Sequence, residues 1–293
     1  MVKRTLFFGS ACRLSLKNSQ LVIENKETGE LKTCPIEDIG YAVIEDQSVS
    51  ITIPALNALS RNNSAVVFCD ERRMPFSMLL NLDSNNVLAE VYKLQIEASA
   101  PLKKNLWKQI IVAKVENQAR LLNEIGKDGD ALKPYYMNVK SGDSDNREGI
   151  AARLYWKSLF GEDFIRSREG DSPNAFLNYG YSILRAGMAR AIMGSGLFPA
   201  FGLFHKNRYN AFPLADDLME PYRPYVDQIV YQLHSDGKVK LDIGAKQEFL
   251  RLLFKDARFN NVTRPMEIAL SITTASLVKC LKGETKQLLF PAL

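Results

Sequence analysis

The feature of the sequence that most constrains the fold is a change in hydrophobic periodicity near residue 85. Before it, short apolar segments are separated by polar turns such as Glu27-Thr28-Gly29-Glu30, in the pattern of β-strands. After it, apolar residues recur at spacings of three and four, as in 102–113, which is typical of amphipathic helices. The chain is therefore expected to combine two kinds of domain. The predicted strands are 6–8, 13–16, 20–24, 31–34, 41–44 and 65–69, with one short helix over 55–60.

These patterns predict an α+β protein with an N-terminal β-rich domain followed by a larger all-helical domain. We place the β-rich domain at 1–82, a polar linker at 83–90 and the helical, catalytic domain at 91–293. At 293 residues the chain is long enough for each domain to bury a core of its own. The polar segment 127–145 is expected to be a loop. Further helices are predicted over 147–160, 213–234, 245–255 and 265–282, and over a segment that begins with Ser172 as N-cap and ends at Gly194.

Composition excludes several classes of protein. Hydrophobic residues make up 46% of the chain and charged residues 24%, which is the balance of a globular protein. Every apolar stretch is interrupted well before about 18 residues, so no membrane-spanning helix is expected. The first residues lack the apolar core of a secretory signal, which indicates a cytoplasmic protein. The four cysteines match no zinc or disulfide pattern and are expected to be reduced packing residues: Cys12, Cys34, Cys69 and Cys280.

The positive charge is concentrated in the second half of the chain. Residues 146–293 contain 20 Lys and Arg against 15 Asp and Glu, whereas the two types balance in 1–145. Between residues 146 and 225, eight of the ten basic residues are Arg, whose planar fork suits phosphate oxygens. This pattern is compatible with an anionic partner. Ordinary solvated helix faces, paired with carboxylates, would produce the same pattern.

Chemistry-bearing residues cluster around one of the two histidines. The sequence has no GxxxxGK[ST], GxSxG or HExxH motif, and no GxGxxG after a strand, which disfavours the common nucleotide-binding and hydrolase classes. His205 lies shortly before Asp217 and Glu220, which would share a helix face unless Pro221 bends the chain. One imidazole with two or three carboxylates is a ligand set suited to manganese or magnesium. A packed histidine beside a helix cap is the simpler structural interpretation.

Glu148 adds a further acidic residue. It begins a helix that also contains Gly149, Ala151 and Ala152, whose small side chains would allow another backbone or a ligand to approach. A Glu in the first turn of a helix is also favoured by the helix dipole alone.

Three ordered motifs carry a resemblance to a known family. They are NREGIAARLYWKSLFG from Asn146, FLNYGYSILRAGMARAI from Phe176 and GLFHKNRYNAFPLADDLMEPYRPYVD from Gly202. Together with the β-rich beginning, they resemble the first CRISPR-associated protein, the integrase of CRISPR adaptation, in the form that accompanies type II systems. The resemblance spans nearly the whole chain.

The resemblance implies partners and a metal site. A protein of this family would form a homodimer and bind double-stranded DNA, namely the donor duplex and the repeat array. It would also join a small ferredoxin-like second CRISPR adaptation protein. No membrane partner is expected. Its divalent cation, Mg²⁺ or Mn²⁺, would be held by Glu148, His205 and Glu220, which are also the catalytic residues. Asp217 would be an additional acid. Many family members carry Asp at the position of Glu220, so the acidic side chain of this protein is one methylene longer there.

The resemblance also implies a reaction. Each 3′-hydroxyl of a short duplex would attack a phosphodiester at the repeat array in a transesterification. Basic residues that neighbour the ligands in sequence would then hold DNA phosphates. Phosphate contacts do not read the bases, which suits an enzyme whose donor DNA can have any sequence. Those residues are Arg147, Arg153, Lys206 and Arg208. The alternatives are a DNA-binding assembly protein without catalysis of its own and a nuclease of branched DNA.

The aromatic residues in these motifs are expected to pack in the core and not to stack on bases, because they recur at helical spacing. They are Tyr155, Trp156, Tyr179 and Tyr181. His234 lies beyond the motifs and is expected not to be a ligand.

Overall fold

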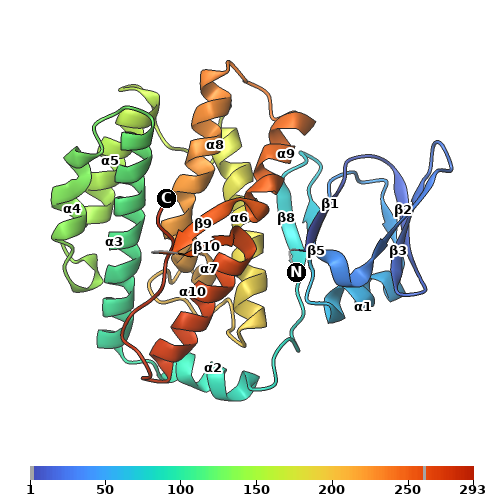
Figure 1. The fold of residues 1–293 in the computed structure, drawn as a ribbon, viewed down its shortest axis with the longest axis horizontal. Coiled ribbons are helices and arrows are strands. Elements are labelled where there is room, and N and C mark those ends of the chain that lie inside the picture. Colours follow the sequence, from blue (N-terminus) through green and yellow to red (C-terminus); the bar gives the residue numbers. More distant parts are fainter. Residues whose placement is uncertain (1–2, 260–261) are drawn as a thin grey trace. The chain divides into compact units, whose positions relative to one another are not determined.

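The computed structural model describes residues 3–259 and 262–293, and the chain divides into two compact units, Met1–Asn86 and Val87–Leu293. Figure 1 shows strands in the first unit and mostly helices in the second. The expected mixed architecture, β-rich before helical, is therefore confirmed at this level. No helix of the described residues is long and apolar enough to cross a membrane.

The first unit contains two sheets and one helix. Its elements are β1 (Arg4–Phe8), β2 (Cys12–Lys17), β3 (Gln20–Asn25), β4 (Leu31–Pro35), η1 (Ile36–Asp38), β5 (Ile39–Ile44), β6 (Ser50–Ile51), α1 (Ile53–Arg61), β7 (Ala65–Cys69) and β8 (Pro75–Leu79). All six predicted strands and the predicted helix are confirmed. The sequence analysis missed β6, which has only two residues, and β8, whose apolar residues do not alternate regularly.

One sheet has the order β1-β5-β7-β8 and the other β4-β3-β2-β6. In the first sheet β5 pairs in parallel with β1 and β7, while the edge strand β8 is antiparallel to β7. A two-residue turn at Asn18 and Ser19, both with positive φ, joins the antiparallel strands β2 and β3. Apolar side chains of both sheets and of α1 form the core, among them Leu14, Leu21 and Leu59.

The second unit is built around long helices. Its elements are α2 (Leu88–Glu97), α3 (Ala100–Glu124), η2 (Asp130–Leu132), α4 (Lys133–Met137), η3 (Ser141–Asp143), α5 (Arg147–Phe160), α6 (Asn174–Gly194), α7 (Pro213–Met219), η4 (Glu220–Tyr222), α8 (Arg223–Ser235), α9 (Ile243–Arg251), η5 (Leu252–Phe254), β9 (Asp256–Phe259), β10 (Val262–Pro265) and α10 (Met266–Leu281).

The expectation of an all-helical second domain is wrong, because β9 and β10 form an antiparallel pair. The β-branched residues Val262 and Thr263 favour an extended strand there. The predicted helix 213–234 is divided, since α7 ends at Met219 and Pro221 lies in the single turn η4 before α8. The loop 127–145 contains short helices, and Pro173, not Ser172, occupies the N-cap position of α6.

Most residues of helix α6 are buried. Tyr179 and Tyr181 of α6 and Tyr155 of α5 are all buried, so their predicted packing role is confirmed. Trp156 packs against Phe160 and Phe164. The four cysteines are free and buried, as expected.

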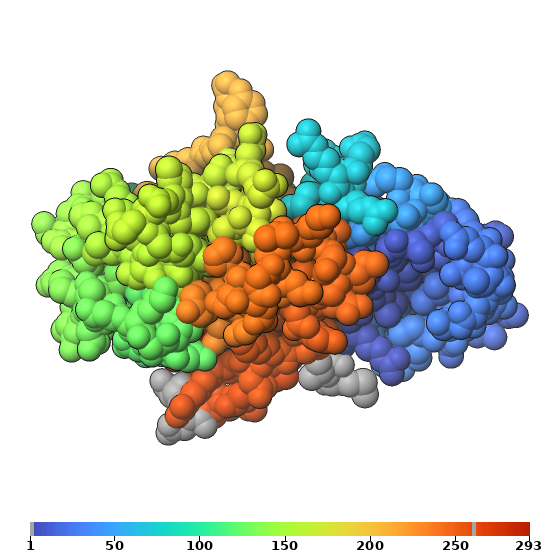
Figure 2. All heavy atoms as spheres, turned by 90° about the horizontal axis from the view of Figure 1, so that it is seen from above, coloured from blue at the N-terminus to red at the C-terminus, as the bar shows by residue number. Residues whose placement is uncertain are grey.

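The segment after α5 lies beside the end of α8. The ring of Phe160 meets the edge of His234 at 5.6 Å between centroids, and the Ser172 hydroxyl donates to the Lys238 carbonyl. Figure 2 shows this yellow-green part of the chain on the surface next to the orange part that follows α8. The contact with Phe160 gives His234 a packing role at the end of α8.

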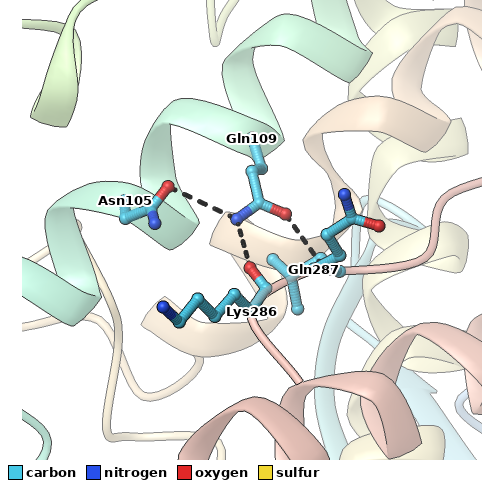
Figure 3. Close-up of a pocket in the computed structure, with 5 residues that line it drawn as sticks. Asn105, Gln109, Lys286 and Gln287 are labelled. Carbon is cyan, nitrogen blue, oxygen red and sulfur yellow. Dashed lines mark hydrogen bonds between the residues drawn. The ribbon is translucent and has the colours of Figure 1, made fainter.

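Residues 284–293 form a strap along α3. The Gln109 side chain donates to the Lys286 carbonyl at 2.9 Å and accepts from the Leu288 amide at 2.8 Å, as Figure 3 shows. Two turns later, Asn117 donates to the carbonyls of Pro291 and of Pro221, at 3.0 Å and 2.8 Å. Helix α3 thus fixes both the strap and the turn η4.

Gly180 provides a test of the packing between α6, α8 and α9. A Cβ at this position would lie 2.4 Å from Val226 Cγ1 and 2.8 Å from Phe249 Cδ1. We expect Gly180→Ala to lower the free energy of unfolding by about 1–3 kcal/mol in urea titrations, although Ala is the better helix former. The control Ser182→Ala, on the same helix, should change it by no more than about 0.5 kcal/mol. An increase in stability for Gly180→Ala would contradict this close packing.

Candidate functional site

Glu148 is placed by the cap of α5. The Asn146 side chain accepts from the Gly149 amide at 3.2 Å, while its backbone adopts a left-handed conformation. The Asp143 carboxylate accepts from the amides of Arg147 and Glu148, at 2.8 Å and 3.1 Å. These bonds satisfy the free N–H groups of the first turn and so fix the position of Glu148 at the start of α5.

Lys114 of α3 joins Glu148 to Glu220. Its Nζ lies 2.6 Å from Glu148 Oε1 and 2.6 Å from Glu220 Oε2. The two carboxylate oxygens are therefore at most twice this distance apart. The ammonium and the Glu220 carboxylate are almost completely buried, whereas the Glu148 side chain is 25% exposed. A buried cation thus holds together two acids that come from different helices.

Charge balance favours the ionised forms of Lys114 and Glu220 despite their burial. Burial alone would lower the pKa of Lys114, but Glu220 and Glu148 outweigh it and raise that pKa. Burial alone would raise the pKa of Glu220, but Arg223 and Lys114 outweigh it and lower that pKa. Arg223 Nη2 contacts the second oxygen of Glu220 at 2.9 Å. The cluster of two carboxylates and two cations is therefore formally neutral.

His205 is held by Asp217. Its Nδ1 lies 2.5 Å from Asp217 Oδ1, and the other carboxylate oxygen accepts from the amides of Leu203 and Phe204, at 2.6 Å and 3.0 Å. Since an ionised carboxylate can only accept, Nδ1 donates in this contact, and the neutral form of the ring presents the lone pair of Nε2. The hydrogen bond to Asp217 raises the pKa of His205, against the opposing effect of burial. Asp217 therefore orients the ring and the loop that carries it.

The predicted ligands are partly brought together. Within residues 3–259 and 262–293, no three His, Cys, Asp or Glu side chains gather closely enough to hold a metal ion. Glu148 and Glu220 meet at Lys114, and the charge of Glu220 acts on His205. The ligand set Glu148, His205 and Glu220 stays a prediction.

The donor atoms nevertheless suit a divalent cation. Glu220 Oε2 is buried and has an ion pair with Lys114 but no hydrogen bond of good geometry within the described structure. Carboxylate oxygens of this kind, with an imidazole nitrogen, match manganese and magnesium. In this structure the ammonium of Lys114 supplies the positive charge between the two carboxylates.

Two hollows meet at His205. The first, of about 540 Å³, has a strongly basic lining that includes Arg166, Arg168, Arg185 and Arg223. The second, of about 520 Å³, has three further basic residues, Lys103, Lys206 and Arg208, in its lining. Since His205 lines both, an extended anion such as a nucleic-acid strand could pass across it.

The structure separates the four predicted DNA-binding residues. Lys206 and Arg208 are exposed beside His205. Arg147 is turned toward Asp145, with Nε 2.8 Å from its carboxylate. Arg153 is exposed five residues after Glu148, about 140° further round α5. Of these four residues, Lys206 and Arg208 are the ones that line a hollow at His205.

Lys114 was missed by the sequence analysis. A signal was present, because this charged residue falls at a position of the apolar stripe formed by Ile110, Ile111 and Val115. A charged residue among buried positions requires a partner, but the sequence does not reveal which acids supply it. The arginines of the first hollow were recognised only as part of the general Arg excess.

A second buried carboxylate lies behind the site. Asp227 of α8 accepts from the hydroxyls of Tyr155, at 2.7 Å, and of Tyr181. Arg223 lies over the ring of Tyr181, 4.7 Å from its centroid. Burial raises the pKa of Asp227 to about 6, although the two tyrosine hydrogen bonds oppose the rise. This network links α5, α6 and α8.

Comparisons with known proteins agree on one family. Residues 6–264 match the family model described as CRISPR associated protein Cas1. A curated relative from Neisseria meningitidis serogroup C (strain 8013), named CRISPR-associated endonuclease Cas1, is 40% identical over 86% of this chain and 84% of its own length.

Two solved structures share the fold. A casposase bound to integration product superposes with a TM-score of 0.81 at 22% identity, covering 98% of this chain and 92% of that one. A chain of a Cas6-RT-Cas1–Cas2 complex superposes with a TM-score of 0.76 at 16% identity, covering 97% of this chain and 35% of that one. At these identities the structures establish similarity of fold.

The raised pKa of Asp227 predicts a pH dependence of stability. A carboxyl with a pKa of about 6 when folded and 3.8 when free binds its proton more tightly in the folded state. Its stabilising contribution is complete below the free pKa and is lost as pH rises through the folded pKa. We therefore expect wild type to lose about 1 kcal/mol of unfolding free energy relative to Asp227→Asn between pH 5 and pH 7. Urea unfolding at both pH values measures this, and a gain for wild type would contradict it.

The ion pairs of Lys114 predict a large effect on stability. Lys114→Met leaves two carboxylates close together without their shared cation, so we expect the metal-free protein to lose about 3–5 kcal/mol of unfolding free energy. The control Lys157→Met breaks an exposed pair with Glu162 and should cost no more than about 1 kcal/mol. Equal effects of the two substitutions in urea titrations would show that the bridge contributes nothing special.

Proposed function

The chain belongs to the CRISPR-associated Cas1 family, and from that premise we propose that it is a metal-dependent DNA integrase of CRISPR spacer acquisition, of the type II form. In this proposal, 3′-hydroxyl ends of a short duplex attack phosphodiesters of the repeat array by transesterification. The catalytic residues lie in the helical domain.

One observation carries the proposal. Two carboxylates, Glu148 and Glu220, converge on one buried cation, and the charge of Glu220 acts on an oriented imidazole at the meeting point of two basic hollows. Acids, imidazole and flanking cations are the groups that phosphodiester chemistry requires. A divalent cation, Mg²⁺ or Mn²⁺, bound by Glu148, His205 and Glu220 would neutralise charge on the attacked phosphate and the departing oxygen.

The protein's own residues position the DNA. Lys206, Arg208 and the arginines of the first hollow hold phosphates on either side of His205 without reading bases. Asp217 keeps the His205 ring in the orientation that presents Nε2. Asp217 acts here by positioning the ring, because both of its oxygens already accept hydrogen bonds.

The structural relatives support the proposed partners. One relative is a casposase bound to integration product, and another lies in a complex with Cas2. By analogy, this chain would bind donor and target DNA and join a small ferredoxin-like partner of the Cas2 kind as a homodimer. The curated names describe endonucleases, which favours nicking of branched DNA as the second candidate function.

Substitution of the two predicted ligands tests the catalytic role. Glu148→Ala and His205→Ala should each reduce joining of a 3′-ended duplex to a repeat-bearing plasmid by at least about 100-fold, because each removes a group that stabilises developing charge. The control Glu162→Ala removes an exposed carboxylate that follows the end of α5 and should retain joining. Joining that survives both site substitutions would leave only the role of a DNA-binding assembly protein.

Chelation separates the same alternatives without any substitution. The integrase loses joining in excess chelator and regains it with Mg²⁺ or Mn²⁺. Nicking of branched DNA without any joining, with the partner protein present, would favour the nuclease.

The positions of Lys206 and Arg208 predict how they contribute to affinity. Lys206→Ala and Arg208→Ala should each weaken binding equally for unrelated DNA sequences and reduce the salt slope of log Kd by about 1. Arg153→Ala is the control, because Arg153 lies on a different face of α5 from Glu148. It should weaken DNA binding less than either of the other two substitutions. Fluorescence anisotropy over a series of salt concentrations measures all three, and a sequence-dependent loss would contradict a phosphate contact.

A further inference from the structure

We propose that Lys114 is an internal cation that holds Glu148 and Glu220 together in the DNA-free protein, and that it makes binding of the divalent metal depend on bound DNA. The inference rests on the proposed function, because it takes these two carboxylates as metal ligands. It adds a coupling between the metal and the nucleic acid that the ligand set alone does not imply.

The first step is geometric. Lys114 Nζ contacts one oxygen of each carboxylate at 2.6 Å. A metal ion held by the same two carboxylates would need the space that the ammonium occupies. Ammonium and metal therefore compete for one position. The competition is direct at Glu220, whose other oxygen already pairs with Arg223 at 2.9 Å.

The second step concerns charge. Lys114 and Arg223 balance Glu148 and Glu220, so the cluster is formally neutral before any metal arrives. Adding a divalent cation to a mostly buried, neutral cluster leaves two uncompensated positive charges in a region of low dielectric constant. The free protein should therefore bind the metal weakly.

The third step brings in the DNA. The hollows on either side of His205 are lined by basic residues, so phosphates bound there bring negative charge close to the cluster. Arg223, which lines the first hollow, also pairs with Glu220, so a phosphate bound there would lie next to the cluster. Bound DNA thus supplies the missing negative charge beside the cluster.

A consequence follows from thermodynamic linkage. If DNA increases the affinity for metal by some factor, the metal must increase the affinity for DNA by the same factor. The carboxylates would remain close together without metal, because Lys114 holds them. An integrase of this kind would assemble its metal site mainly on DNA.

The wild-type protein provides the first test. Mn²⁺ binding to the metal-free full chain is measured by the electron paramagnetic resonance of free Mn²⁺, with and without a short duplex whose 3′ ends lack the hydroxyl. DNA with Mn²⁺ but without protein serves as the blank. We expect the duplex to increase the Mn²⁺ affinity of the protein at least 10-fold. Equal affinities with and without DNA would overturn the proposal.

Lys114→Met provides the second test. Without the ammonium, Mn²⁺ should bind the DNA-free protein at least 10-fold more tightly than it binds wild type, and the gain from DNA should shrink. Mn²⁺ should also raise the melting temperature of this variant more than that of wild type. Lys114→Arg keeps the charge and should retain weak DNA-free binding.

Lys103→Met is the matched control. Lys103 lines the hollow beside His205, so its loss removes the same charge from the neighbourhood without vacating the position between the carboxylates. It should change the DNA-free Mn²⁺ affinity much less than Lys114→Met does. Equal effects would overturn the specific role of Lys114. If Lys114→Met fails to fold, Lys114→Arg and the wild-type comparison still decide the proposal.

The outcomes also separate this inference from the proposed function. Mn²⁺-dependent joining with DNA-independent Mn²⁺ affinity would overturn the coupling and leave the integrase intact. Coupled Mn²⁺ and DNA binding without any joining would support the coupling and overturn the integrase.

Discussion

The bridge from Lys114 to two carboxylates is the interaction on which the candidate site depends. Glu148 begins one helix and Glu220 ends another, and both reach the same ammonium on α3 at 2.6 Å. Like charges so close together would repel each other in a buried environment without a cation between them. The long helix α3 therefore provides the reference point from which the acids are placed.

The same helix fixes the site from a second direction. Asn117, one turn after Lys114, donates to the Pro221 carbonyl directly after Glu220 and to the strap at Pro291. On the other side, Asp217 binds the backbone of the His205 loop and the ring itself. The acidic cluster of the sequence is thus divided in function, with Glu220 facing the cation and Asp217 orienting the histidine.

Much of the architecture could be predicted because it depends on local patterns. Period-two segments became β1 to β5 and β7, and α5 has the predicted bounds Arg147–Phe160. The β9–β10 pair was missed because short, exposed strands next to a helix carry little periodic signal. The break at Pro221 was one of two alternatives, since its outcome depends on what η4 packs against.

The sequence by itself determined the β-rich and helical regions, the concentration of arginine and the three motifs that carry the family resemblance. Only the tertiary structure decided that a lysine from another helix lies between two of those acids, and that Arg147 turns to Asp145 while Lys206 and Arg208 remain beside His205. The physical reason is that charge pairing acts across space between segments far apart in the chain, whereas periodicity reports only what lies within a few residues.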